Sequence, residues 1–146
     1  MDGSISEELS ETWDGSVWSN SSFITSSYDV DGKVIQWLEA LWNANVWEYS
    51  SREESSYDMA GNNSEVLSQD WSGSAWVNAY RVSDLYNANG SIVDEIAEVW
   101  NGSAWVYLSG RENSYDAGGY LAQEIRLIRV GGMWQNEILL HYRSKW

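Results

Sequence analysis

The sequence contains no cysteine and little positive charge. The absence of cysteine excludes a disulfide framework and a thiolate metal site, and it leaves the cellular compartment open. Only eight residues are Lys or Arg, against 22 that are Asp or Glu, so the formal net charge is −14. Because nucleic acids and anionic membrane surfaces bind cationic faces, we expect neither as a partner.

Long apolar runs are missing as well. No run approaches the roughly 18 residues that a membrane-spanning helix requires. The opening residues, M-D-G-S-I-S-E-E, have neither the basic start nor the apolar stretch of a signal peptide. We therefore expect no membrane span in this sequence, and if the natural protein is exported, its signal peptide has been removed here.

Aromatic residues are abundant, with 11 tryptophans and nine tyrosines. They recur with a spacing of 29 residues, which indicates a repeat architecture. The first tryptophan of the repeat falls at Trp13, Trp42, Trp71 and Trp100. The second falls at Trp18, Trp47, Trp76, Trp105 and Trp134. A tyrosine falls at Tyr28, Tyr57, Tyr86 and Tyr115, and a glycine at Gly3, Gly32, Gly61, Gly90 and Gly119.

Each repeat predicts two strands. Counted from the glycine, apolar residues recur at the second, sixth and tenth places, and the sixth place is always Leu or Ile: Leu9, Leu38, Leu67, Ile96 and Ile125. A period of two is typical of a strand with one buried face. The segment I-V-D-E-I-A-E-V-W is by itself also compatible with a helix, but the repeat average and the flanking turns favour a strand.

Two kinds of turn separate the strands. The segment from Tyr28 to Lys33 predicts a three-residue hairpin loop, in which Gly32 is left-handed and Asp29 bonds the backbone ahead of it. This loop sets Tyr28 opposite Val34, and Ile24 opposite Leu38. The other turn carries Asp-Gly or Asn-Gly pairs, which are strong hairpin signals, and it places both tryptophans of a repeat on one face.

The predicted fold is all-β: a ten-stranded antiparallel up-and-down meander in a single domain, 1–146. Its five hairpin repeats are 3–31, 32–60, 61–89, 90–118 and 119–146. Closure into a pseudo-fivefold barrel is expected, because the chain starts with one strand and stops at the end of another, so that the first strand can pair with the tenth. The alternative is a β-hairpin solenoid, which the divergent last repeat (Arg129, Ser144 and Lys145 for Trp, Tyr and Asp) supports.

Tryptophan, leucine, isoleucine and tyrosine are predicted to share the buried face. The opposite parity reads as solvent-facing and includes His141 together with Ser19, Ser21, Thr25, Glu48, Ser50, Arg52, Glu54, Arg81, Glu112 and Arg143. A polar row departs from the apolar rule on the buried face: Glu7, Gln36, Glu65, Asp94 and Gln123. The predicted register sets Ser26, Ser55, Asp84, Asn113 and Tyr142 opposite this row. The row is either the lining of a pocket or a layer of paired or hydrated groups.

At W-N-G-S-A-W and Y-D-A-G-G the repeat resembles the W…W…Y-D-x-x-G repeats of bacterial secreted and surface proteins, common in Bacteroidetes-type exported proteins. The shape is also similar to β-flower barrels with hairpin petals. The resemblance covers nearly the whole chain and implies an extracellular or cell-surface location, with no particular activity.

No catalytic constellation stands out. Paired carboxylates such as Asp84 and Asp94 can do acid–base work on a glycosidic bond, but they occur in one repeat only. A single histidine is better explained as a surface residue. The loop Asp29-Val30-Asp31-Gly32 lacks the further ligands of a calcium site. We therefore expect no enzyme activity, no metal and no cofactor.

Two functional classes fit the pattern. The first is a non-enzymatic structural or adhesive module of a secreted or surface protein, in which tryptophans fill a wide barrel. The second is a multivalent lectin-like module that binds carbohydrate by stacking and hydrogen bonds. A small apolar ligand inside the barrel is a third, weaker option, and another surface protein is a further partner class. The candidate ligand-binding residues are Trp18, Trp47, Trp76, Trp105, Trp134, Asn20, Asn78, Asn136, Glu7, Glu65 and Asp94.

Overall fold

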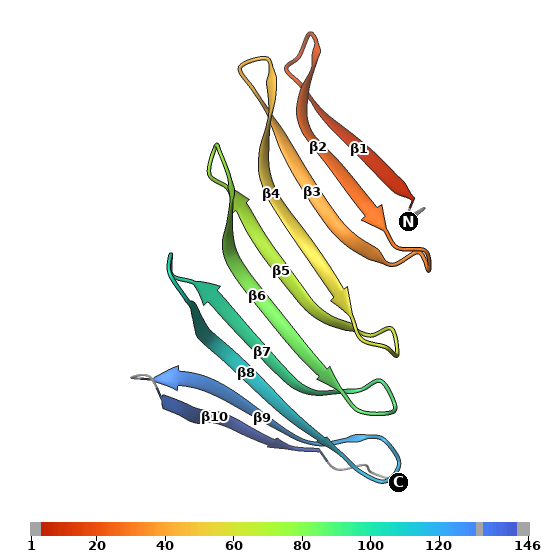
Figure 1. Cartoon of the computed structure of the whole chain (residues 1–146), viewed down its shortest axis with the longest axis vertical. Helices are drawn as coiled ribbons and strands as arrows, with labels where there is room; N and C mark the ends of the chain where they lie inside the picture. The colour runs from red at the N-terminus through yellow and green to blue at the C-terminus, as the bar shows by residue number, and fades with distance from the viewer. Residues whose placement is uncertain (1–3, 131–132, 143–146) are drawn as a thin grey trace. The chain divides into compact units, whose positions relative to one another are not determined.

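The computed structural model describes residues 4–130 and 133–142, without the side chains at 129, 130 and 134. Ten strands form one antiparallel sheet, in which the strand order follows the chain (Figure 1). They are β1 (Ile5–Trp13), β2 (Trp18–Tyr28), β3 (Val34–Asn43), β4 (Val46–Tyr57), β5 (Asn63–Trp71), β6 (Trp76–Tyr86), β7 (Ile92–Trp100), β8 (Trp105–Tyr115), β9 (Leu121–Val130) and β10 (Met133–His141). The predicted all-β meander is therefore confirmed, while its closure into a barrel and the alternative solenoid stay predictions.

The chain divides into two compact units, and each is described by itself. The first is Met1–Ser55 with Leu67–Ala79, and the second is Ser56–Val66 with Tyr80–Trp146. Strands β1–β3 belong to the first unit and β7–β10 to the second, while β4, β5 and β6 contribute to both. That residues 1–146 form a single domain stays a prediction.

The loop between β2 and β3 has the predicted form. The N–H of Asp29 donates to the carbonyl of Lys33 at 2.9 Å, and that of Gly32 donates to the carbonyl of Asp29 at 3.2 Å. Gly32 has a φ of +80°, which glycine adopts without strain. Oδ1 of Asp29 accepts the amides of Asp31 and Lys33, both at 2.9 Å. The same loop recurs at Asp58, Asn87 and Asp116.

The turn inside each repeat brings its two tryptophans together. In the first repeat the N–H of Asp14 donates to the carbonyl of Val17 at 3.2 Å, and Gly15 has a φ of +105°. Directly opposed pairs are Trp13 with Trp18, Trp42 with Trp47, and Trp100 with Trp105. Their ring centroids lie 5.4, 5.0 and 5.3 Å apart. The prediction that both tryptophans share a face is confirmed.

Two β-bulges, which the predicted register did not include, recur along the repeats. One inserts an extra residue in the second strand, at Ser21, Ser50, Leu108 and Glu137. The other inserts one at the start of the first strand of the next repeat, at Ile35, Val93 and Ala122. A single extra residue moves every side chain beyond it to the opposite face. The predicted faces are therefore correct only up to each bulge.

The bulges correct several predicted neighbours. Tyr28 lies opposite Val34, as expected, but Ile24 lies opposite Glu39 rather than Leu38. Likewise Asp84 lies opposite Glu95, and not opposite Asp94. The predicted partners of the polar row, Ser26, Asp84 and Asn113, therefore face Trp37, Glu95 and Glu124 on the other side of the sheet.

We call the side of the sheet that carries the paired tryptophans the tryptophan face. Beyond the bulges this face also carries residues that were predicted to face solvent on the other side: Thr25, Arg52, Glu54, Arg81, Glu112 and His141. The tyrosines of the repeat lie on the opposite face, at Tyr28, Tyr86 and Tyr115, which corrects the prediction that they join the tryptophans. Arg143, Ser144 and Lys145 lie outside the described residues.

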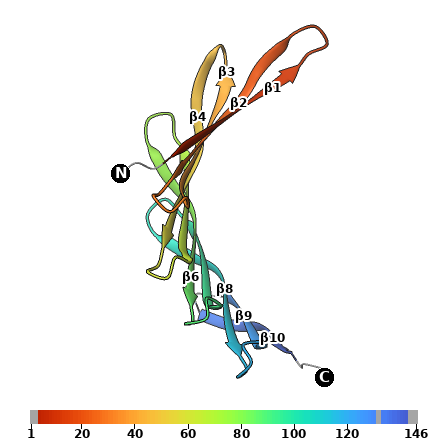
Figure 2. The same cartoon turned by 90° about the vertical axis from the view of Figure 1, so that its right-hand side faces the viewer.

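Each unit is a single layer of strands (Figure 2). A single layer covers little apolar surface, so the buried hydrophobic residues of the described part are Ala40 and Ala97 only. The tryptophan face was predicted to be buried, yet Trp13 is 49% exposed and Trp18 is 60% exposed. The burial that exists lies where neighbouring repeats meet, and that is where the site must be sought.

A candidate ligand site on the tryptophan face

The second strand of one repeat lies beside the first strand of the next, and we call this place a junction. Shortly beyond the bulge of the second strand, one residue of each junction points to the tryptophan face; Phe23, for example, comes two residues after Ser21. Its identity changes along the chain: Phe23, Arg52, Arg81 and Gly110. Its neighbour on the next repeat changes with it: Ala40, Gln69, Glu98 and Leu127. We name each junction by its first residue.

At the Arg81 junction the side chain of Arg81 lies over the ring of Trp105 on the tryptophan face. Its guanidinium carbon lies 4.6 Å from the centre of the Trp105 ring, which is cation–π geometry. Its Nε donates to Oε2 of Glu98 at 2.8 Å, and Nη2 forms a second, ionic bond to the same oxygen. Glu98 is only 6% exposed, and its charge is tolerated because the guanidinium is paired with it. Glu65 lies 3.9 Å from Nη1 of the same arginine.

At the Arg52 junction an arginine takes the same place, with a neutral partner on the next repeat and with Glu54 of its own strand 3.4 Å from Nη1. Its guanidinium carbon lies 4.8 Å from the centre of the Trp76 ring. Its Nε donates to Oε1 of Gln69 at 2.7 Å, and Nε2 of Gln69 donates in turn to Oδ1 of Asn78 at 2.7 Å. This junction is therefore also closed over its tryptophan.

At the Phe23 junction the face is open. Phe23 lies opposite Ala40, whose side chain offers no polar partner and does not reach across the strands. The ring centroids of Phe23 and Trp47 lie 5.9 Å apart and the two rings are tilted relative to one another. Phe23 therefore contacts the indole but forms no ionic bond across the junction. A hollow of about 400 Å³ results, and it is lined by Phe23, Thr25, Leu38, Ala40, Trp47 and Tyr49.

The rim of this hollow is held in place and accessible. The ring of Tyr49 packs against Trp71 and Trp76, with centroid distances of 5.5 and 5.7 Å. Trp47 is paired with Trp42 and still 38% exposed. Two aromatic faces and a threonine hydroxyl therefore border a space that a small molecule can enter.

At the Gly110 junction the absence of a side chain leaves a second hollow, of about 290 Å³. It is lined by Asp94, Ile96, Gly110, Glu112, Leu127 and Asn136. Asp94 and Glu112 lie directly opposite one another on β7 and β8. The second hollow is thus acidic where the first is aromatic.

The structure distributes the sequence-predicted site residues over these junctions. Trp47 borders the first hollow, and Asp94 and Asn136 border the second. Trp76 and Trp105 lie against arginines, Asn78 bonds Gln69, and Glu65 lies near Arg81. Trp18 packs on Trp13, Asn20 lies opposite Glu11, and Glu7 lies opposite Thr25. The side chain of Trp134 lies outside the described part. The candidates therefore do not form one site.

Sequence reasoning missed Phe23, Thr25 and Ala40. A signal for them existed, because Phe23 is the only phenylalanine of the chain and stands where the next two repeats carry arginine. It was hidden by the bulge at Ser21, without which Phe23 has the wrong parity for the tryptophan face.

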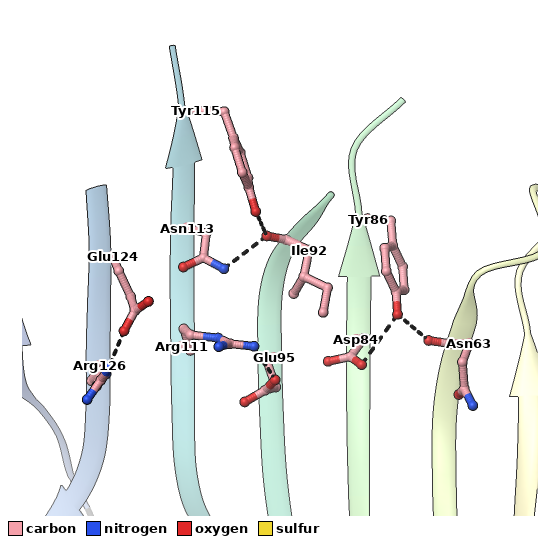
Figure 3. A network of polar contacts seen from close by, with 10 residues as sticks. All are labelled: Asn63, Asp84, Tyr86, Ile92, Glu95, Arg111, Asn113, Tyr115, Glu124 and Arg126. Atoms are coloured by element: carbon pink, nitrogen blue, oxygen red, sulfur yellow. Dashed lines mark hydrogen bonds and ion pairs between the residues drawn. The ribbon is translucent and has the colours of Figure 1, made fainter. Parts of the chain in front are cut away.

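The opposite face of the second unit carries a network of polar contacts (Figure 3). The hydroxyl of Tyr86 donates to the carbonyl of Asn63, and that of Tyr115 donates to the carbonyl of Ile92, both at 2.7 Å. These bonds tie the end of the second strand of a repeat to the start of its first strand. The network is therefore structural.

The carboxylate of Asp84 in that network is in an unfavourable electrostatic environment. Burial, followed by the charge of Glu95, raises the pKa of Asp84 above its usual value of 3.8. Glu95 is paired with Arg111 at 2.5 Å, whereas Oδ1 of Asp84 is buried and has no hydrogen-bond partner within the described part. Asp84 and Asp94 do not share a site, so this pair does not support acid–base catalysis.

Residues 4–130 and 133–142 hold no group of three or more His, Asp or Glu side chains arranged to bind a metal ion. In the same residues we find no helix with the length and apolar character of a membrane span.

Similar solved structures come from Bacteroidetes. A protein of unknown function from Bacteroides fragilis matches 94% of this chain with 92% of its own, at 12% sequence identity and a TM-score of 0.58. A DUF3836 family protein from Parabacteroides distasonis matches 95% of this chain with 91% of its own, at 13% identity and a TM-score of 0.39. No protein-family model and no curated protein matches the sequence. The first similarity is one of fold, and the site must be interpreted from its own chemistry.

Proposed function

We propose that the protein is a non-enzymatic binding module that takes a neutral sugar ring in the hollow of the Phe23 junction. The observation that supports it is the open space beside Trp47, at a position that arginine closes in the next two repeats. The hollow measures about 400 Å³ and lies on an exposed face. A ligand therefore reaches it without any rearrangement of the strands.

The lining favours a saccharide over other small molecules. The C–H groups on one side of a pyranose carry partial positive charge, and the face of an indole or phenol ring carries partial negative charge. Trp47 and Tyr49 offer two such faces, while Thr25 and the hydroxyl of Tyr49 can donate to and accept from sugar hydroxyls. Charged side chains are absent from this lining, so a neutral sugar fits better than an acidic one.

As part of this proposal the module belongs to a secreted or surface protein, which rests on the resemblance of its repeat to exported Bacteroidetes repeats. The hollow lies within the first compact unit. A purely structural or adhesive module is the competing function, and it requires no ligand in the hollow.

Titration with the methyl glycosides of glucose, galactose, mannose and N-acetylglucosamine tests the proposal. We expect one of them to shift the indole N–H signal of Trp47 in NMR spectra, with a dissociation constant of about 1 mM, or about −4 kcal/mol. Trp47→Ala should weaken binding at least about tenfold, which corresponds to about 1.4 kcal/mol. Trp18→Ala is the matched control, because Trp18 also packs on a partner tryptophan but does not line the hollow of the Phe23 junction.

If none of the four glycosides shifts the indole N–H signal of Trp47, the structural module is favoured. Equal losses in Trp47→Ala and Trp18→Ala would place the site elsewhere. If naphthalene shifts this signal and the sugars do not, an apolar ligand is favoured.

A further inference from the structure

We infer that the Arg81 junction is a latent copy of the same site, closed by its own arginine, so that the module binds one ligand per chain. This inference rests on the proposed function. It identifies the two residues that decide whether a junction binds, Arg81 and Glu98, and it replaces the expectation of a multivalent lectin.

Apart from these two residues, the two junctions carry linings of the same chemical kind. The hydroxyl of Thr25 corresponds to that of Ser83, and Leu38 corresponds to Ile96, at a spacing of two repeats. The aromatic rims correspond in the same way, with Trp47 and Tyr49 at one junction and Trp105 and Tyr107 at the other. The register around them is also the same: Phe23 lies opposite Ala40, and Arg81 lies opposite Glu98.

The arginine occupies the place that a ligand would need. Its guanidinium lies 4.6 Å from the centre of the Trp105 ring, a stacking distance on the indole face. A sugar on Trp47 would use the corresponding face of that indole. One ring face cannot hold both, so Arg81 and a ligand exclude one another at this junction.

Glu98 keeps the arginine in that place. Two hydrogen bonds to one carboxylate fix the direction of the guanidinium plane. Glu98 is 6% exposed, so departure of the arginine leaves a buried charge without its partner. A ligand of millimolar affinity cannot offset that cost, and the junction stays closed.

Ala40 explains why the first junction is open. It stands in the place of Glu98 and is 7% exposed, but it has no group that could anchor a long side chain over the indole. Phe23 is uncharged and packs beside Trp47 without covering it. Opening a junction therefore requires the two changes together.

The test exchanges the two residue pairs, Phe23 with Ala40 and Arg81 with Glu98, between the junctions. Arg81→Phe with Glu98→Ala should open the second site and raise the stoichiometry of the binding glycoside from one to two in calorimetry. The indole N–H signal of Trp105 should then shift on titration, whereas we expect no shift of this signal in the wild type. Phe23→Arg with Ala40→Glu should close the first site and lower binding at least about tenfold, with the thermal unfolding of each variant as the check on folding.

The outcomes distinguish failure of this inference from failure of the proposed sugar binding at the Phe23 junction. A wild type that binds no glycoside overturns both. A wild type that binds one glycoside, with an opened variant that is folded and still binds one, overturns the inference alone. A wild type in which the glycoside already shifts the Trp105 signal also overturns it, because Arg81 would then not close its junction. If the opened variant does not fold, persistence of binding in the closed variant overturns the inference.

Discussion

The Phe23 and Arg81 junctions are built on the same backbone register and differ at two facing residues. One pair, Phe23 with Ala40, leaves a hollow over a tryptophan, and the other, Arg81 with Glu98, covers it with a charged side chain. The tryptophans themselves are the same in both. The comparison shows that the repeated residues build the sheet, while the residues that vary between repeats decide whether a tryptophan is open or covered.

The two junctions also differ in what their loss would cost. The Arg81 junction contains a buried charge that depends on one partner, whereas the Phe23 junction contains only apolar contacts that solvent partly reaches. The Arg52 junction lies between them, because its arginine bonds the neutral Gln69. Substitutions can therefore rank the junctions by stability, independently of any ligand.

The largest effect is expected for Arg81→Ala. It leaves the carboxylate of Glu98 buried and unpaired, which should lower the free energy of unfolding by about 3 kcal/mol. Arg52→Ala removes a hydrogen bond to a neutral amide and should cost about 1 kcal/mol. Chemical denaturation of both variants measures the difference. Glu98→Gln added to Arg81→Ala should recover much of the loss, and equal losses for the two arginines would show that Glu98 is not buried as described.

A smaller loss is expected where the repeat does not vary. Gly61 has a φ of +87° in its hairpin loop, which a β-branched residue adopts only under strain. Gly61→Val should therefore cost about 2 kcal/mol. Ser64→Val, in strand β5 three residues later, should change stability by no more than about 0.5 kcal/mol. The two melting temperatures give the comparison, and if they coincide the turn assignment is wrong.

The smallest effect, and the one that depends on pH, is expected on the opposite face. Because the pKa of Asp84 is raised in the folded state, its ionised form destabilises the fold at all pH values above that raised pKa. This penalty decreases as the pH falls and is absent below the ordinary value of 3.8. Asp84→Asn should therefore be more stable than the wild type at pH 7, with a difference that disappears by about pH 3. Asp70→Asn, at an exposed position of β5, is the control for the removal of one negative charge, and an identical profile for both variants would contradict the burial of Asp84.

The strands and loops could be predicted because their signals are local. Asp29 and Gly32 determine their loop through contacts within five residues, and the same chemistry is repeated in four loops. The pairing of tryptophans across the shorter turn follows from the turn itself. Both features need only the sequence of one hairpin.

The bulges could not be predicted in this way. The extra residue is a serine at Ser21 and Ser50 but a leucine at Leu108, so no one side chain marks the position, which is visible only in the strand pairing. One missed bulge exchanges the two faces of the remaining strand. For this reason Trp47 was among the predicted site residues, but Phe23 and Thr25, which lie beyond the bulge, were not.

The tyrosine bonds of the opposite face have a consequence for how such a repeat can change over time. Tyr86 and Tyr115 fasten their hairpins by hydroxyl bonds to the main chain, and a carbonyl acceptor does not depend on which side chain its residue carries. The fastening therefore tolerates mutation of the residue that it grips. A duplicated hairpin brings its own fastener with it, on the face away from the tryptophans. The residues of a junction can then change one repeat at a time without loosening the hairpin that carries them.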